Sequence, residues 1–179
     1  MKDRIFIWSF LSNFFIMTES NFVLRNIQYE DNLALARVIR KTMEEFKVNK
    51  PGTVYYESTT DHLFELFQST AGSEYFVVEL NGEVAGGAGI FPTDQLPPGV
   101  CELVKMYIQP AARGMGIGKE LIRRCLQSAR ELNYHGVYVE SMFELKQAVR
   151  LYEHFGFQYL NEQIGNSQHL TDIWMMKKL

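Results

Sequence analysis

The sequence predicts an α/β fold centred on a strand, a helix and a second strand that runs parallel to the first. Residues 100–108 carry apolar side chains on both faces, as an interior strand covered on two sides does, although the same pattern fits a short buried helix. A helical apolar repeat begins at Lys119, and a short apolar run follows at residues 136–140. Upstream, Asn81-Gly82 joins two β-rich runs, which is a strong hairpin signal.

Length and composition predict one domain, over residues 18–179. The 179 residues are 46% hydrophobic and 22% charged, which is ordinary for a globular chain with a full core. A net charge of −3 gives no general attraction to nucleic acid or an anionic membrane, so we expect neither partner. Cys101 and Cys125 fall at apolar positions, which predicts buried thiols in a reducing, cytoplasmic compartment. The four histidines have no ligand spacing, so no metal is expected.

Residues 1–17 form an apolar and aromatic segment ahead of this domain. It is short for a transmembrane span and is interrupted by Ser9, Ser12 and Asn13. A signal peptide is an alternative, but no small-x-small cleavage site follows. We interpret the segment as an upstream extension, because Met17 would make an ordinary start. If the extension is native, its apolar residues could dock on a partner or a membrane surface.

The first half of the domain is predicted as strand, helix, loop and helix. Residues 22–25 form the strand, and Glu30-Asp31-Asn32 supplies cap residues for a helix that runs through Phe46. Lys50-Pro51-Gly52 breaks this helix, and a loop leads to a second helix capped at Asp61.

The hairpin over residues 75–91 carries three glycines in its second arm, Gly86, Gly87 and Gly89. Glycine weakens a strand, so three of them predict a bulge or a close approach by another backbone. Residues 92–99 form a loop before the central strand. Simple alternation along that strand gives two faces, one with Cys101, Leu103, Lys105 and Tyr107 and the other with Glu102, Val104, Met106 and Ile108.

A glycine-rich turn, residues 113–118, connects the central strand to its helix. Pro110 ends the strand because it has no N–H to donate. A helix N-terminus has unpaired amides and a partial positive charge, so glycines there would let a phosphate approach, and Arg113 adds a cation. The same glycines could equally make only a tight turn. The spacing matches neither the P-loop nor the dinucleotide-binding fingerprint.

The last third predicts another helix on the sheet and two closing strands. Ala148, Leu151, Tyr152 and Phe155 share one helical face, and Gly156 provides the stop. On this pattern alone Tyr152 is a core residue. Residues 171–179 are expected to form a terminal strand that pairs with residues 157–161.

The two segments together resemble the GNAT superfamily of N-acetyltransferases. Arg-Gly-x-Gly-Ile-Gly after a strand ending in Tyr-Ile-x-Pro is similar to the family's acyl-CoA-binding motif, and Ala-x-x-Leu-Tyr-x-x-x-Gly-Phe is similar to its second motif. The resemblance covers nearly everything after Met17. It implies a mixed, mostly antiparallel sheet with a splayed central parallel strand pair, flanked by about four helices.

The resemblance also implies an activity, the transfer of an acetyl group from acetyl-CoA to a primary amine of a small molecule or peptide by direct attack. It implies no metal, and a homodimer is possible. Carried over residue by residue, the cofactor contacts are Met106, Tyr107 and Ile108 for the pantetheine arm, and Arg113, Gly114, Met115, Gly116, Ile117, Gly118 and Lys119 for the pyrophosphate.

Two catalytic residues follow from the same resemblance. Tyr152 is expected to protonate the leaving thiolate, and Glu102 to act as the general base, with its pKa raised by an apolar strand face. A backbone amide at Met106 or Tyr107 would donate to the thioester carbonyl. Glu102 could instead be solvated or paired with an arginine, with water as the base.

Other family-based expectations concern the acceptor. Tyr55, Tyr56 and Glu57 are expected to line its pocket, unless the aromatic residues only pack. Leu145 stands where the family often has an asparagine that holds the pantetheine arm. The alternative functions are a non-catalytic acyl-CoA-binding sensor or partner-binding module, and the transfer of a longer acyl group.

Overall fold

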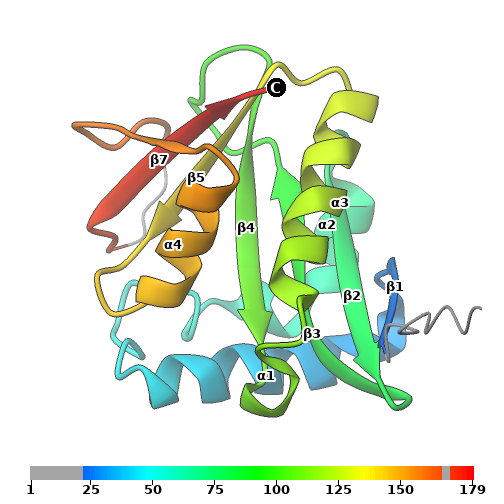
Figure 1. Ribbon diagram of the computed structural model, residues 1–179. Coiled ribbons are helices and arrows are strands. Elements are labelled where there is room, and N and C mark those ends of the chain that lie inside the picture. Colours follow the sequence, from blue (N-terminus) through cyan, green and yellow to red (C-terminus); the bar gives the residue numbers. More distant parts are fainter. Residues whose placement is uncertain (1–21, 167–169) are drawn as a thin grey trace, which may run out of the picture.

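The computed structural model describes residues 22–166 and 170–179, so the proposed extension at residues 1–17 lies outside the described residues. One seven-stranded sheet with the order β1-β2-β3-β4-β5-β7-β6 forms its centre (Figure 1). The strands are β1 (Phe22–Asn26), β2 (Glu74–Leu80), β3 (Glu83–Phe91), β4 (Val100–Ile108), β5 (Gly136–Ser141), β6 (Gln158–Tyr159) and β7 (Ile173–Lys178). The α-helices are α1 (Asn32–Glu45), α2 (Leu63–Ser69), α3 (Ile117–Glu131) and α4 (Lys146–His154). Short 3₁₀ turns are η1 (Tyr29–Asp31), η2 (Ser58–Asp61) and η3 (Pro110–Ala112).

The parallel pair β4 and β5 is the only departure from antiparallel pairing among these strands. It is short, since residues 100–102 pair with residues 136–138 and the two strands then separate. The mixed, mostly antiparallel sheet with a splayed parallel pair and four α-helices is therefore confirmed. Beyond Glu102, the β4 backbone has no strand neighbour on its β5 side within the described ranges.

Helices cover both faces of the sheet, as the two-sided apolar pattern of the central strand requires. Figure 1 shows α3 and α4 on one face and α1 and α2 on the other. The first core includes Leu121 and Cys125 of α3, and the second includes Leu35 and Ile39 of α1. These helices form where apolar side chains recur every three or four residues, which gives each helix one buried stripe.

The hairpin of β2 and β3 forms as predicted, because Asn81 and Gly82 both take positive φ, 54° and 81°. The predicted close approach at the glycines is also confirmed. A Cβ on Gly86 would lie 2.2 Å from the carbonyl oxygen of Tyr107, so only glycine allows β4 to pair with β3 here.

A β-bulge interrupts β4 at Lys105. Gly87 pairs with Tyr107 and Gly89 with Val104, so β4 has one more residue than β3 in this stretch. Lys105 has a φ of 49°, which is in the left-handed region, and its carbonyl accepts a hydrogen bond of 2.9 Å from the hydroxyl of Tyr75. Tyr75 is buried, so the bulge is held from inside the core.

The bulge makes the predicted strand faces wrong from Lys105 onward. One extra residue reverses the alternation, so that Met106 and Ile108 pack on the α3 and α4 core together with Leu103. Tyr107 instead packs on the α1 and α2 core together with Val104. The sequence pattern carries no signal for this reversal, because all these side chains suit either core.

The predicted cap of the second helix is also wrong. Asp61 is the last residue of η2, and α2 begins at Leu63 with no side-chain hydrogen bond at its N-cap. The Asp61 carboxylate instead makes two hydrogen bonds, of 2.6 and 2.7 Å, with the Arg40 guanidinium. Because the Asp61 carboxylate pairs with Arg40 of α1, it does not cap the N-terminus of α2.

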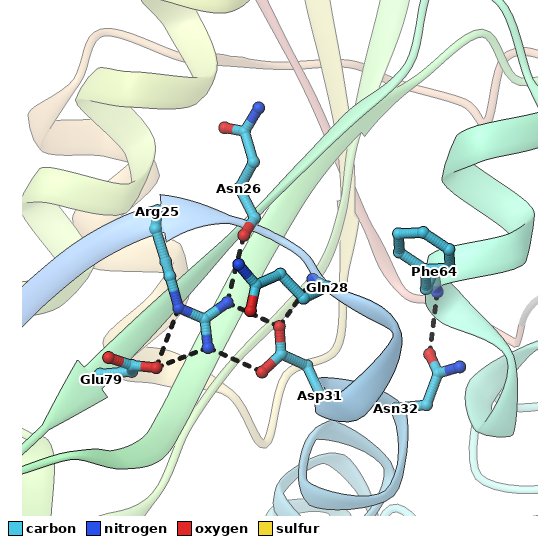
Figure 2. A network of polar contacts seen from close by, with 7 residues as sticks. All are labelled: Arg25, Asn26, Gln28, Asp31, Asn32, Phe64 and Glu79. Atoms are coloured by element: carbon cyan, nitrogen blue, oxygen red, sulfur yellow. Dashed lines mark hydrogen bonds and ion pairs between the residues drawn. The ribbon is translucent and has the colours of Figure 1, made fainter.

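A polar network fixes the start of α1 against the sheet (Figure 2). The Arg25 guanidinium makes bonds of 2.7 and 2.8 Å to the Asp31 carboxylate and of 2.6 and 2.9 Å to Oε1 of Glu79. The Asn32 side-chain oxygen accepts a bond of 2.9 Å from the amide of Phe64 at the start of α2. These contacts join β1, β2, α1 and α2, and thereby set the position of both helices.

The C-terminal strands confirm the predicted pairing of β7 with the strand after Gly156, but β6 is only two residues long. The sequence did not predict that β7 would lie between β5 and β6. Cys101 and Cys125 are buried free thiols, as predicted, and burial raises the pKa of the Cys101 thiol to about 12. No helix within the described ranges combines the length and the apolar character needed to cross a bilayer.

Candidate active site

The glycine turn leads directly into α3, whose N-cap is Gly116. Gly114 and Gly116 have φ of 80° and 83°, and a Cβ on either would meet no atom within 4 Å. The amides of residues 114–119 donate no hydrogen bond to any residue that the structure describes. The turn therefore presents a row of unpaired amides at the positive end of a fifteen-residue helix.

Gly118 has a different role from the other two glycines. A Cβ at this position would lie 2.9 Å from Cδ2 of Leu151 and 3.4 Å from Cε of Met106. Glycine therefore lets the first turn of α3 approach both α4 and β4. This close packing defines the floor of the cavity beside the turn.

A cavity of about 400 Å³ extends from the turn along β4, and we call it the cofactor cavity. Of the ten residues predicted to bind a cofactor, all but Met115 line it; Met115 is 42% exposed. Helix α1 and the α4 region complete the wall. The lining residues are Thr42, Phe46, Met106, Tyr107, Ile108, Ala112, Arg113, Gly114, Gly116, Ile117, Gly118, Lys119, Leu145, Gln147, Ala148 and Leu151.

Arg113 lines this cavity while its guanidinium is engaged with the protein. Nε donates to the carbonyl of Ile108 at 3.0 Å, and the two Nη atoms donate to the Glu45 carboxylate at 2.6 and 2.8 Å. The guanidinium also lies 5.3 Å from the ring centre of Phe46, which is a cation–π contact. Arg113 therefore connects the end of β4 to the end of α1, and its bond lowers the pKa of Glu45.

A second cavity, of about 450 Å³, lies on the other side of Tyr107 and Leu145, which line both cavities. We call it the acceptor cavity. Its wall comes from α1, the loop before η2, β4 and the end of β5. The lining residues are Met43, Val48, Thr53, Val54, Glu57, Ser58, Thr59, Leu66, Phe91, Glu102, Leu103, Val104, Lys105, Tyr107, Glu140, Ser141, Met142, Leu145 and Thr171.

Glu102 lies in the acceptor cavity at the last paired position of β4 and β5. It is only 5% exposed, so the alternative of a solvated strand-end carboxylate is wrong. Thr93 Oγ1 donates to Glu102 Oε2. Its neighbour on this face is Val104; Met106 and Ile108, which were expected beside it, lie on the opposite face because of the bulge.

The loop before η2 contributes one of its three predicted residues. Glu57 lines the acceptor cavity, and its Oε2 lies 2.7 Å from Nζ of Lys105. Tyr55 and Tyr56 do not line it, which corrects that expectation: the Tyr55 hydroxyl donates to Glu44 at 2.6 Å, and Tyr56 is 62% exposed. The two rings pack on each other, 4.9 Å apart.

Glu140 is a cavity residue that sequence reasoning missed. It follows Tyr138 on β5, and its carboxylate accepts bonds from the Tyr138 hydroxyl at 2.8 Å, the Gln163 amide at 2.9 Å and the Thr171 hydroxyl at 3.0 Å. The predicted parallel pairing was a usable signal, because carboxyl ends of parallel strands meet at one edge of a sheet and Glu102 lies on the neighbouring strand. Thr171 and Gln163 gave no comparable signal.

Tyr152 is buried in the α3 and α4 core, with its ring 5.7 Å from that of Phe157. It lines neither cavity; its hydroxyl lies 3.9 Å from Sδ of Met106, which does line the cofactor cavity. Burial raises the pKa of Tyr152, and also that of Tyr107 between the two cavities. Both phenols therefore keep their protons at neutral pH.

The comparisons with known proteins agree with this geometry. Residues 37–157 match the Acetyltransferase (GNAT) family. The chain belongs to this family. It is 37% identical over 159 residues to the Uncharacterized N-acetyltransferase YjgM of Escherichia coli (strain K12), an alignment that covers 88% of this chain and 95% of the relative. As a member of the GNAT family with such relatives, the protein is an acyltransferase.

Solved structures show the same GNAT fold. A GNAT acetyltransferase from Staphylococcus aureus superposes with a TM-score of 0.74 at 17% identity, covering 88% of this chain and 98% of that one. Spermidine N-acetyltransferase from Vibrio cholerae, in complex with CoA and spermine, superposes with a TM-score of 0.64 at 25% identity, covering 89% and 96%.

The residues around the cofactor cavity fit an acyl-CoA. Unpaired amides at a helix N-terminus suit the pyrophosphate, and the absence of Cβ atoms on Gly114 and Gly116 leaves room for it. Among the described residues, the β4 backbone beyond Glu102 pairs with no strand on its β5 side, so it can bond to the amides of an extended arm. Leu145, in place of the family's usual asparagine, contributes apolar wall to both cavities.

Proposed function

We propose that the protein is an acetyl-CoA-dependent N-acetyltransferase that acts on a primary amine by direct attack. The observation that carries this proposal is the junction of the two cavities at Tyr107 and Leu145. An amine in one cavity and a thioester in the other would meet there without a protein-bound intermediate. The CoA and spermine bound to the Vibrio cholerae enzyme support the same pairing of donor and acceptor.

Acetyl-CoA would supply a thioester, and transfer forms a C–N bond to the amine while the C–S bond breaks. The amine nitrogen must lose a proton, and Glu102 is the proposed acceptor of it, directly or through water. Tyr152 is the proposed donor of a proton to the departing sulfur, reached by a shift of the Met106 side chain that now contacts its hydroxyl. A β4 amide at Met106 or Tyr107 would donate to the carbonyl oxygen.

The cofactor site is tested by Gly116→Asp. Gly116 has positive φ, so an aspartate there strains the backbone, but the space around it is open, and a carboxylate at the helix N-terminus would compete with the pyrophosphate. We expect acetyl-CoA to raise the thermal midpoint of the wild type but not of this variant. Gly82→Asp is the matched control, because Gly82 also has positive φ (81°) and open space but lies in the hairpin turn. Equal stabilisation of all three proteins would contradict the assignment.

Catalysis is tested by Tyr152→Phe. Loss of the proton donor should lower kcat about a hundred-fold or more, while the affinity for acetyl-CoA measured by calorimetry stays the same. Free CoA release with a panel of amines reports the rate. An unchanged kcat would remove Tyr152 from the mechanism, and the absence of CoA release with every amine would favour the alternative of a non-catalytic acyl-CoA sensor.

A further inference from the structure

Thr42 of α1 lines the cofactor cavity with a hydroxyl that the protein leaves without a hydrogen bond. The side chain is buried, and among the described residues its Oγ1 has no partner. Two other buried threonines donate to backbone carbonyls, Thr53 at 2.7 Å and Thr60 at 2.6 Å. Burial of an unpaired hydroxyl is unfavourable, so one that lines a ligand cavity points to a bond that forms with the ligand.

The place of Thr42 on α1 indicates which part of a ligand it would meet. Phe46 follows about one helical turn later, lines the same cavity and contacts the Arg113 guanidinium at the start of the glycine turn. Met43 follows Thr42 directly and lines the acceptor cavity instead. Thr42 therefore lies between the glycine turn, where the pyrophosphate is proposed, and the junction of the two cavities, where the thioester is proposed.

The part of acetyl-CoA between its pyrophosphate and its thioester is the pantetheine arm, whose polar groups include two amides. A threonine hydroxyl both donates and accepts, so it can bond to the N–H or to the carbonyl of an amide. Threonine in a helix populates two χ1 conformers, so rotation about the Cα–Cβ bond can present the hydroxyl to the cavity. We propose that the Thr42 hydroxyl forms a hydrogen bond with an amide of the pantetheine arm. This inference rests on the proposed function, since it takes acetyl-CoA as the ligand.

Thr42→Val tests the inference because it should change folding and binding in opposite directions. The substitution replaces the hydroxyl by a methyl group of similar size. Without ligand, the variant should unfold at a higher urea concentration than the wild type, because no hydrogen bond within the protein is lost. Acetyl-CoA should bind to it about ten-fold more weakly in calorimetry, because an amide of the arm then has no partner in a desolvated site. Thr42→Ser keeps the hydroxyl and should retain most of the wild-type affinity.

Thr60→Val is the matched control for both measurements. Thr60 is also a buried threonine, but its hydroxyl donates to the carbonyl of Val54 and its side chain lines neither cavity. This variant should unfold at a lower urea concentration than the wild type and should bind acetyl-CoA with unchanged affinity. The two threonine variants therefore differ in the sign of the stability change and in the effect on the cofactor.

A truncated ligand tests whether Thr42 contacts the arm rather than the pyrophosphate. 3′-Phosphoadenosine 5′-diphosphate keeps the nucleotide and the pyrophosphate of CoA but lacks the arm. Its affinity, measured through competition with acetyl-CoA, should be the same for Thr42→Val and the wild type. An equal loss of affinity for the truncated ligand and for acetyl-CoA would overturn the contact with the arm.

The outcomes separate this inference from the function on which it rests. An unchanged affinity of Thr42→Val for acetyl-CoA would overturn the inference and leave the proposed N-acetyltransferase intact. A Thr42→Val variant that unfolds at a lower urea concentration would show that the hydroxyl is bonded within the protein, which also overturns the inference. Failure of the wild type to bind acetyl-CoA would overturn the proposed cofactor site and the inference with it.

Discussion

Thr42 is a polar residue whose hydroxyl is buried. It lies on α1 beside the cofactor cavity, it is 5% exposed, and its hydroxyl is the one buried side-chain polar atom without a hydrogen-bond partner among the described residues. A buried hydroxyl without a partner costs its desolvation energy and gains nothing in return.

Replacement of this hydroxyl by a methyl group should therefore stabilise the protein. We expect Thr42→Val to raise the free energy of unfolding by about 1 kcal/mol, measured by urea denaturation. Thr60→Val is the matched control with the opposite sign. Its hydroxyl is also buried but donates to the carbonyl of Val54 at 2.6 Å, so the change should cost about 1 kcal/mol. A loss of stability in both variants would show that Thr42 has a partner in solution.

At the scale of elements, the bulge in β4 decides which side chains enter which cavity. It turns Met106 toward the cofactor cavity and Tyr107 toward the junction, and it directs Lys105 to Glu57. Its conformation includes a left-handed residue with a side chain, which is strained and persists only when neighbours hold it. Tyr75 supplies that support through its bond to the Lys105 carbonyl.

The effect of the Tyr75 bond on catalysis can be measured separately from its effect on stability, by comparing two variants. Tyr75→Phe and Tyr134→Phe each remove one tyrosine-to-carbonyl bond, of 2.9 Å to Lys105 and 2.8 Å to Gly72 respectively. Both should lower the free energy of unfolding by about 1 kcal/mol. Only Tyr75→Phe should also lower kcat/KM, by about ten-fold, because it loosens the catalytic strand. Equal kcat/KM values for the two variants would contradict this role of the bulge.

Elements that depend on neighbouring residues were predicted correctly, whereas features that depend on distant partners were not. The hairpin at Asn81 and Gly82 and the helix after the glycine turn depend on neighbouring residues, so local pattern was sufficient. Asp61 was expected as a cap, but a partner on another helix, Arg40, binds it instead. All the expected cofactor residues except Met115 line one cavity, because they are nearly contiguous on one strand, turn and helix. The acceptor cavity is assembled from distant segments, so Glu140 was missed.

At the scale of the whole molecule, the two cores contain several tyrosines. Burial raises the pKa of Tyr75, Tyr107 and Tyr152, and burial together with a bond to Glu140 raises that of Tyr138. The folded state therefore keeps protons that the unfolded state loses near pH 10. These tyrosines therefore leave the free energy of unfolding unchanged below about pH 10, and they lower it as the pH rises further.

Alkaline unfolding should consequently be steep and cooperative. Each such tyrosine should reduce the free energy of unfolding by about 1.4 kcal/mol per pH unit above its unfolded pKa. Circular dichroism and tyrosinate absorbance, followed together from pH 8 upward, provide the measurement. Ionisation of all nine tyrosines before any loss of secondary structure would contradict the prediction.

The sequence by itself determined the elements, the mixed sheet, the family and the cofactor half of the candidate site. These depend on periodicity, turn chemistry and two motifs, and each is encoded in residues close together along the chain. Only the tertiary structure decided the faces of β4, the Arg113 bond to Glu45 and the acceptor cavity. A bulge, an ion pair across helices and a cavity between β4, β5 and α1 depend on long-range pairing, and a single sequence carries no local signal for it.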